Sequence, residues 1–198
     1  MIGKIRKGRS FGGCIRYVTQ KGDAKIIASE GVLLGTAEEM AQSFRWQCLL
    51  NPDVAKPVGH IALSFKPEDA PRLTDAFMTR LAGEYLELMG IRNTQFIVVR
   101  HHGTDNPHCH IVFNRVDFDG KVISDSNDFR RNERVTKMLK DKYSLTYSEG
   151  KQAVKTEKLH ASERVKYEIY RAVKEALRSA DTWKEFQNKL LKMGVEME

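Results

Sequence analysis

The alternation of hydrophobic and polar residues predicts a strand and a helix in the first third of the chain. Residues 60–65 (HIALSF) alternate apolar and polar positions, which is typical of a half-buried strand. The segment before it predicts a helix that begins at Thr36, because Thr36 and Glu39 have the spacing of a capping box. Apolar residues recur on one face of this helix: Met40, Phe44 and Cys48. Asn51 and Pro52 are expected to end it, since the residue before a proline disfavours the helical conformation.

Residues 68–89 predict one long amphipathic helix. Its apolar positions form a stripe that should be buried: Leu73, Phe77, Leu81 and Leu88. Gly90 is the predicted C-terminal stop, because glycine readily adopts the left-handed conformation that often follows a helix.

Two strands and a turn are predicted in the middle of the chain. Residues 95–100 (QFIVVR) and 108–116 (HCHIVFNRV) are short apolar runs that indicate buried strands. Asp119 and Gly120 indicate a tight turn. After this turn, residues 121–124 predict a short edge strand.

The pattern becomes helical from about Phe129. Two further helices are predicted near residues 160–180 and 182–193, and Thr182 and Glu185 give the last one a capping box. The expected order is β, α, β, α, β, β, α, α, α, with a hairpin in the middle. This order predicts an α+β fold, with a central antiparallel sheet covered on one face by helices and with C-terminal helices after it.

The composition is that of a globular protein with an excess of positive charge. Hydrophobic residues make up 41% and charged residues 30% of the chain, which excludes a disordered chain, a collagen and a coiled-coil rod. The net charge of +7 favours a polyanionic partner, usually nucleic acid, with a merely soluble basic protein as the alternative.

The sequence also bears on the compartment. No run approaches the ~18 apolar residues of a membrane span, and the basic N-terminus lacks the apolar stretch of a signal peptide, so we expect no membrane association. Three widely spaced cysteines form no disulfide framework: Cys14, Cys48 and Cys109. A reducing cytoplasm is the expected location.

Basic residues gather in two places. The N-terminal cluster, Lys4, Arg6, Lys7 and Arg9, precedes a pair of glycines that could let the backbone approach phosphates, and a flexible solvated terminus is the alternative. The helix over residues 130–142 carries the second group, for which a solvated helix face is the alternative. The residues we expect to contact DNA are Lys4, Lys7, Arg9, Arg16, Arg130, Arg131 and Arg134.

Four of the six histidines lie within residues 101–110. His108 and His110 alternate on a predicted strand, so their side chains project from the same face about 6.6–6.8 Å apart. The six residues before His108 predict a hairpin loop that brings His101 beside it. The three imidazoles could then converge on one cation, at about 2.0–2.2 Å from each nitrogen. Cys109 should point to the opposite face and is not expected to be a ligand.

Three protein ligands leave coordination positions open, which is typical of a catalytic rather than a structural metal site. Three imidazoles suit zinc, manganese, cobalt or nickel. Asn114 shares the parity of the strand histidines and could orient a ligand or contact DNA. His102 and His60 are weaker candidates: His102 is expected to point away, and His60 to be structural or surface-exposed. The alternative is that the histidines are ordinary residues of a sheet.

At these residues the sequence resembles the mobilisation relaxases of plasmids and integrative elements (Mob-type, MobP-like), within the HUH endonuclease superfamily. Residues 101–116 (HHGTDNPHCHIVFNRV) look like the family's third motif. Residues 60–69 (HIALSFKPED) look like the second motif, and residues 12–21 (GGCIRYVTQK) resemble the first, which holds the nucleophilic tyrosine. The resemblance covers about residues 1–150 and implies a relaxase/Rep-like palm.

The resemblance implies a role for each motif residue. Tyr17 is the expected nucleophile, and His101, His108 and His110 the metal ligands. A phenol with a pKa near 10 attacks weakly at neutral pH, so a cation that polarises the scissile phosphate is needed. The product would be a 5′-phosphotyrosyl enzyme and a free 3′-hydroxyl, which can later reverse the step. Magnesium or manganese is implied in the cell, and a purified sample could carry zinc, nickel or cobalt.

One departure from the family pattern concerns the hairpin loop. Many relatives carry an acidic residue two positions after the first ligand histidine, where this chain has Gly103, so Asp105 is the candidate for a supporting carboxylate. The general base is not visible; metal-bound water, Asp69 and Glu84 are the candidates.

The resemblance also implies the biological setting. The expected reaction is nicking and rejoining of one DNA strand at an origin of transfer, for mobilisation of a plasmid or integrative element. The expected partners are single-stranded and hairpin DNA at that origin, accessory mobilisation proteins and a coupling protein. Residues 1–150 would be the catalytic domain, and residues 151–198 a helical extension packed on it, at the start of a longer C-terminal region.

Three alternatives stay open. The first is a replication-initiator nuclease of the same superfamily, although a single tyrosine before the histidines favours mobilisation by resemblance. The second is a zinc hydrolase with three histidine ligands, which would need no tyrosine; the chain has no HExxH motif. The third is a non-enzymatic nucleic-acid-binding module with a structural ion, which open-sided ligands disfavour.

Overall fold

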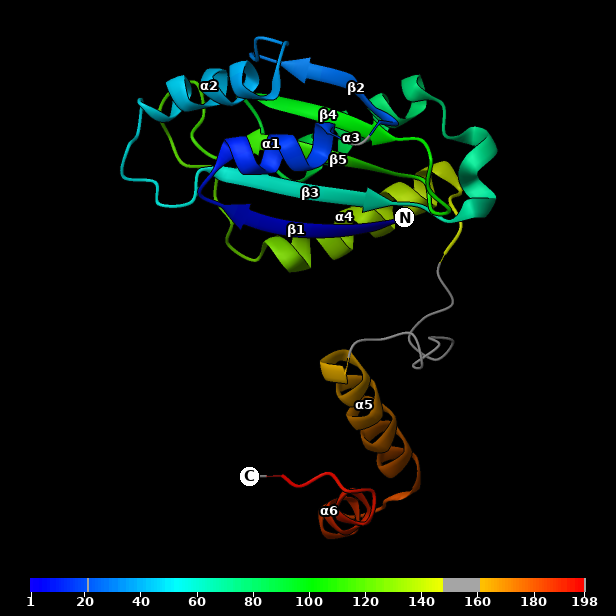
Figure 1. Ribbon diagram of the computed structural model, residues 1–198. Helices are drawn as coiled ribbons and strands as arrows, with labels where there is room; N and C mark the ends of the chain where they lie inside the picture. Colours follow the sequence, from blue (N-terminus) through cyan, green and yellow to red (C-terminus); the bar gives the residue numbers. More distant parts are fainter. Residues whose placement is uncertain (21, 148–160, 198) are drawn as a thin grey trace. The chain divides into compact units, whose positions relative to one another are not determined.

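A computed structural model describes residues 1–20, 22–147 and 161–197 (Figure 1). The chain divides into two compact units, Met1–Ser148 and Glu149–Glu198, which are described separately below. The predicted boundary at residues 150–151 lies outside the described residues, and the packing of the second unit on the first stays a prediction. Among the helices described, none has the length and hydrophobicity needed to cross a membrane.

The first unit is an antiparallel sheet of five strands with helices around it. Its elements are β1 (Ile2–Gly8), α1 (Phe11–Thr19), β2 (Ala24–Glu30), α2 (Ala37–Cys48), β3 (Val58–Ser64), the 3-10 helix η1 (Pro67–Arg72), α3 (Asp75–Leu88), β4 (Phe96–His101), β5 (His108–Asn114) and α4 (Asp128–Tyr143). The strand order is β1-β3-β5-β4-β2, and every neighbouring pair is antiparallel. The predicted α+β class with a central antiparallel sheet is confirmed.

Helices cover both faces of the sheet, whereas the sequence pattern placed them on one face. Helices α3 and α4 pack on the face that carries Ile61 and Ile111. Helices α1 and α2 pack on the opposite face, against Ile97 and Val112. Figure 1 shows α1 in front of the strands. The prediction of a single covered face was wrong because the pattern did not predict the N-terminal helix α1.

The N-terminal residues are ordered as β1 and α1, so the alternative of a flexible solvated terminus is wrong. Strand β1 alternates lysine and arginine with isoleucine and glycine, which weakens its apolar signal. Helix α1 begins with glycines that lower helix propensity. It forms because Ile15 and Val18 are buried against the sheet and because the Ser10 hydroxyl caps it, accepting a hydrogen bond from Gly13 N at 3.2 Å.

The predicted helix over residues 68–89 is two elements. Pro71 lies inside η1, and its missing N–H and its ring prevent a continuous helix through that point. Thr74 then caps α3 by accepting a hydrogen bond from Phe77 N at 3.1 Å. Gly90 follows α3 with a φ of +71°, which confirms it as the stop.

The remaining local predictions are largely confirmed. The Thr36–Glu39 capping box is present at the start of α2. The turn at Gly120 forms, but residues 121–124 contribute only an isolated bridge between Val116 and Val122 rather than a strand. The described part of the second unit holds α5 (Ala161–Ser179) and α6 (Trp183–Lys192), and α6 is capped by Thr182. These two helices pack through a small cluster: Ala172, Ala176, Phe186 and Leu190.

We expect Gly59→Ala to destabilise the first unit, because β3 has no space for a side chain at this position. A Cβ on Gly59 would lie 2.1 Å from Cε1 and Cζ of Phe113 on the paired strand β5. The expected loss is about 1–3 kcal/mol in the free energy of unfolding, measured by urea denaturation. Gly83→Ala is the control: an added Cβ meets nothing within 4 Å there, so this helical substitution should be neutral or stabilising. A Gly59→Ala protein as stable as the parent would contradict the prediction.

Candidate active site

Three histidines meet at one end of the β4–β5 hairpin. His101 and His108 are directly paired across the two strands, and His110 lies two residues further along β5. One ring nitrogen from each histidine lies within 4.8 Å of the other two, a geometry that could hold a metal ion. The hairpin register therefore brings together the three predicted ligands. Cys109 lies on the opposite face, fully buried in the core, where burial raises the pKa of its thiol to about 12.

The surroundings of His101 and His108 fix which nitrogen faces the common centre. His101 Nε2 lies 2.8 Å from the Val18 carbonyl oxygen and so donates its proton there, which leaves Nδ1 to face inward. His108 Nδ1 lies 3.1 Å from the Asn106 carbonyl oxygen, which leaves Nε2 to face inward. The two inward nitrogens are 3.1 Å apart. Such outer hydrogen bonds are the usual partners of metal-bound imidazoles.

The third imidazole is held by a fourth histidine. His110 Nδ1 lies 3.0 Å from Nε2 of His60 on the neighbouring strand β3. His60 is partly buried, and this burial, helped by the positive charge of Arg6, lowers the pKa of His60 below its ordinary value. A neutral His60 can accept the Nδ1 proton of His110, and the Nε2 lone pair of His110 then serves a cation.

These residues fit a divalent cation. His101 and His110 are buried and His108 is half-buried, so His108 is the most exposed of the three candidate ligands. Three neutral imidazole donors leave further coordination positions for oxygen ligands. Three imidazoles suit zinc, manganese, cobalt or nickel.

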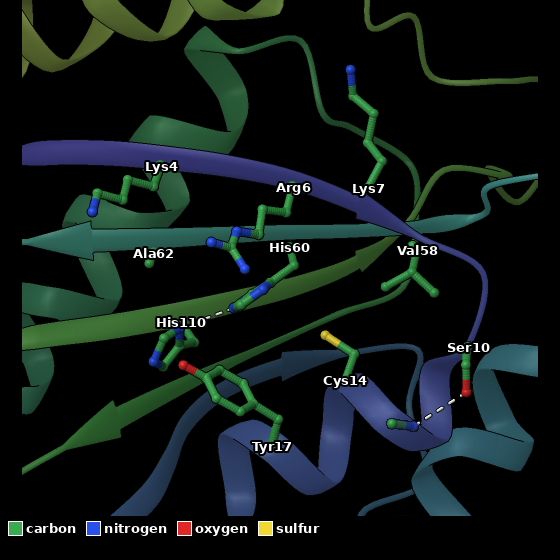
Figure 2. Close-up of a pocket in the computed structure, with 12 residues that line it drawn as sticks. Lys4, Arg6, Lys7, Ser10, Cys14, Tyr17, Val58, His60, Ala62 and His110 are labelled. Carbon is green, nitrogen blue, oxygen red and sulfur yellow. Dashed lines mark hydrogen bonds between the residues drawn. The ribbon is translucent and has the colours of Figure 1, made fainter. Parts of the chain in front are cut away.

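Tyr17 projects from α1 over the same face of the sheet. Its ring meets those of His110 and His60 edge-on, with centroids 5.8 and 6.0 Å away. The side chain is 59% exposed, and its hydroxyl points toward His110 (Figure 2). A substrate atom can thus reach the phenolic oxygen from solvent beside the histidine cluster.

A pocket of about 470 Å³ adjoins Tyr17 on the side of β1. Strands β1 and β3 form its floor, and the first turns of α1 form its wall (Figure 2). Its lining contains no carboxylate: it consists of Lys4, Arg6, Lys7, Gly8, Ser10, Gly13, Cys14, Tyr17, Val58, His60, Ala62 and His110.

Asn114 and Asp105 were predicted to support the metal ligands, and the structure places both in surroundings that differ from this expectation. Asn114 is completely buried and cannot contact DNA, although it does share the face of His110. Its amide donates to Phe44 O at 3.0 Å and its oxygen accepts from Val116 N at 3.1 Å, so it ties β5 to α2. Asp105 is exposed in the hairpin loop, and the carboxylate that holds this loop is Asp23, which accepts from Gly103 N at 2.5 Å.

The basic residues expected to contact DNA are divided between the two faces. Lys4 lies on the pocket side of β1. Lys7 points to the opposite side (Figure 2), where it pairs with Asp125 at 2.9 Å and Asp128 at 2.6 Å. Arg9 and Arg16 are exposed, in the turn before α1 and on α1.

Helix α4 packs on the face of the sheet opposite the histidines, so its basic residues are not part of the pocket: Arg130, Arg131 and Arg134. Arg130 and Arg134 are exposed, and Arg131 donates to Ser124 O at 2.8 Å. Contact of these residues with DNA stays a prediction.

Neither carboxylate named as a candidate general base lines the pocket. Asp69 is buried and accepts hydrogen bonds from the backbone N–H and the hydroxyl of Thr146. Glu84 is bound by Lys142 and Tyr143, and these contacts lower the pKa of its carboxyl. Both carboxylates join the end of α4, or the residues after it, to neighbouring elements.

His60 is the site residue that the sequence pattern underrated. The alternation of apolar and polar residues predicted the strand that holds His60. Its contact with His110, however, depends on the pairing of β3 with β5, which the pattern does not specify. We expect His60→Ala to weaken the affinity for Mn²⁺ by about 10–100-fold, because His110 loses the group that orients it. Isothermal titration calorimetry measures this directly. Unchanged affinity in His60→Ala would contradict the orienting role.

Comparison with known proteins supplies an independent finding. A family model described as relaxase, MobA/VirD2-like, nuclease domain matches residues 17–145. A search of curated proteins gives no significant match. The matched range begins at Tyr17 and includes the three histidines of the cluster.

Proposed function

From the premise that this chain belongs to the relaxase family with a MobA/VirD2-like nuclease domain, we propose that Tyr17 nicks one strand of DNA at an origin of transfer with the help of a divalent cation. The observation that carries this proposal is the placement of an exposed phenol over a cluster of three imidazoles. Family membership supports mobilisation over the replication-initiator and zinc-hydrolase alternatives.

In the proposed reaction, the Tyr17 oxygen attacks the scissile phosphorus and loses its proton. The bond from phosphorus to the 3′-oxygen breaks, and that oxygen leaves as a free 3′-hydroxyl after it takes up a proton. The strand is then joined to the protein by a 5′-phosphotyrosyl bond. Because this bond replaces one phosphodiester by another, a 3′-hydroxyl can attack it and rejoin the strand without ATP.

The residues of the site have separate tasks in this scheme. His101, His108 and His110 would hold the cation, which when bound supplies positive charge to the phosphate oxygens. The hydrogen bonds of the three imidazoles to Val18, Asn106 and His60 keep their donor atoms directed inward. Tyr17 is positioned by α1, whose buried side anchors it to the sheet.

The proposal has a direct test that needs no knowledge of the origin. The protein is incubated with a pool of randomised single-stranded oligonucleotides and Mn²⁺, denatured, and separated by electrophoresis. We expect a protein–DNA adduct that survives denaturation, and sequencing of the attached strands should converge on one sequence. An absence of adduct under these conditions, or attachment through a 3′-phosphate, counts against the proposal. Hairpin DNA, accessory mobilisation proteins, a coupling protein and a cytoplasmic location remain predictions.

A further inference from the structure

Strand β1 places two cations along the edge of the pocket. Arg6 is paired with His60 and Lys4 with Ala62 in the register of β1 and β3, so both side chains share the face of the histidine cluster. Figure 2 shows Arg6 directed toward His60, with Lys4 further along the strand. The strand itself is held in place because Asn132 of α4 donates to Gly3 O at 2.7 Å.

Arg6 and Lys4 differ from Lys7 in whether a carboxylate pairs with their charge. Lys7 is neutralised by two carboxylates on the other face of the sheet. Within the described part of the chain, Arg6 and Lys4 form no ion pair, and no carboxylate lines the pocket into which they project. Both are exposed, so their charge is available to an anion from solvent.

The spacing and chemistry of this edge suit a polyanion. Alternate residues on a strand are about 6.6–6.8 Å apart, which is comparable to the separation of successive phosphates in an extended single strand. Beside the cations, the pocket offers the apolar surfaces of Val58, Ala62 and Cys14, against which a sugar or base could pack. Single-stranded nucleic acid is typically held by a positively charged groove with aromatic side chains beside it, and Tyr17 supplies an aromatic ring in this lining.

We propose that Arg6 and Lys4 bind two successive backbone phosphates of single-stranded DNA, adjacent to the phosphate that Tyr17 attacks. Arg6 lies beside His60, whose ring contacts Tyr17, so Arg6 takes the nearer phosphate and Lys4 the next. Strand β1 thereby acts as a track that leads the DNA to the nucleophile. This inference rests on the proposed function for the identity of the attacked group.

The test measures how the binding of a fluorescent oligo(dT) depends on salt. All proteins carry Tyr17→Phe so that no covalent step interferes. A cation that contacts a phosphate of single-stranded DNA contributes about 0.7 to the slope of log affinity against log salt. We therefore expect Arg6→Gln and Lys4→Gln each to reduce the slope by about 0.7, and the double variant by about 1.4.

A second double variant controls for the loss of charge alone. Arg92→Gln with Lys121→Gln also removes one arginine and one lysine, both exposed, paired with Glu87 and Asp119, and absent from the pocket lining. Its slope should equal that of the parent, and Arg6→Lys should keep the parental slope. All four target positions are exposed, so thermal unfolding should confirm intact folds.

The slopes decide whether Arg6 and Lys4 bind phosphates. An unchanged slope in Arg6→Gln with Lys4→Gln overturns the proposal, as does an equal fall in the control variant or a failure of the parent to bind oligo(dT). The result is also separable from the proposed function. The adduct is assayed separately in the protein that keeps Tyr17. If that protein forms the adduct while the slope is unchanged in the Tyr17→Phe series, only the binding of phosphates by Arg6 and Lys4 is refuted. If the slope falls as expected and no adduct forms, only the nicking reaction is refuted.

Discussion

Replacing Tyr17 by phenylalanine is expected to abolish the denaturation-resistant protein–DNA adduct and to slow strand cleavage by about 10⁴-fold or more. The substitution removes one oxygen, the atom that would bond to phosphorus. It leaves the ring that contacts His60 and His110 in place. The loss should therefore appear in the chemical step, while the affinity for single-stranded DNA stays close to that of the parent.

Folding effects should not obscure this result. The Tyr17 side chain is largely exposed, and substitutions of this kind usually change stability by less than about 0.5 kcal/mol. Tyr147→Phe is a matched control, because Tyr147 is also exposed and lies outside the pocket lining, with its hydroxyl bound to Asp141. It should form adduct at the parental rate. Adduct formation by Tyr17→Phe would assign the nucleophile to another residue.

The histidine cluster could be predicted from the sequence because its geometry is local. His101, His108 and His110 belong to one hairpin, so the alternation of side chains and the loop length are enough to place them together. The same parity argument placed Cys109 on the opposite face, where it is buried. Predictions that rest on neighbouring residues of one hairpin depend little on the rest of the fold.

The parts that could not be predicted depend on contacts between distant segments. The pairing of β1 with β3 puts Arg6 opposite His60, and the pairing of β3 with β5 puts His110 diagonally beside His60. Nothing in their local sequences specifies that strand order. Helix α1 is stabilised by burial against the sheet rather than by its own propensity, so it was missed. The prediction that helices cover only one face of the sheet failed for the same reason, because the face that a helix covers is decided by tertiary packing.

Metal binding should raise the melting temperature of the parent protein and should be lost when one of the three histidines is replaced. A ligand that binds only the folded state at a concentration of 100 times its Kd stabilises by about 2.7 kcal/mol. For a chain of this size, that corresponds to an increase of about 5–10 °C in Tm. We expect Mn²⁺ to produce such a shift in the parent, measured by scanning calorimetry, and EDTA to reverse it.

His108→Ala and His102→Ala form the decisive pair for this centre. His108 supplies one of the three converging nitrogens, so its loss should remove the Tm shift and slow cleavage by at least about 10²-fold. His102 is its near neighbour but is directed away, with Nε2 3.8 Å from Asp75, so His102→Ala should keep both the shift and the cleavage rate. The calorimetric readout separates the two claims: a shift retained in His108→Ala refutes the three-histidine centre, while a shift lost without a change in cleavage shows that the cation takes no part in the reaction.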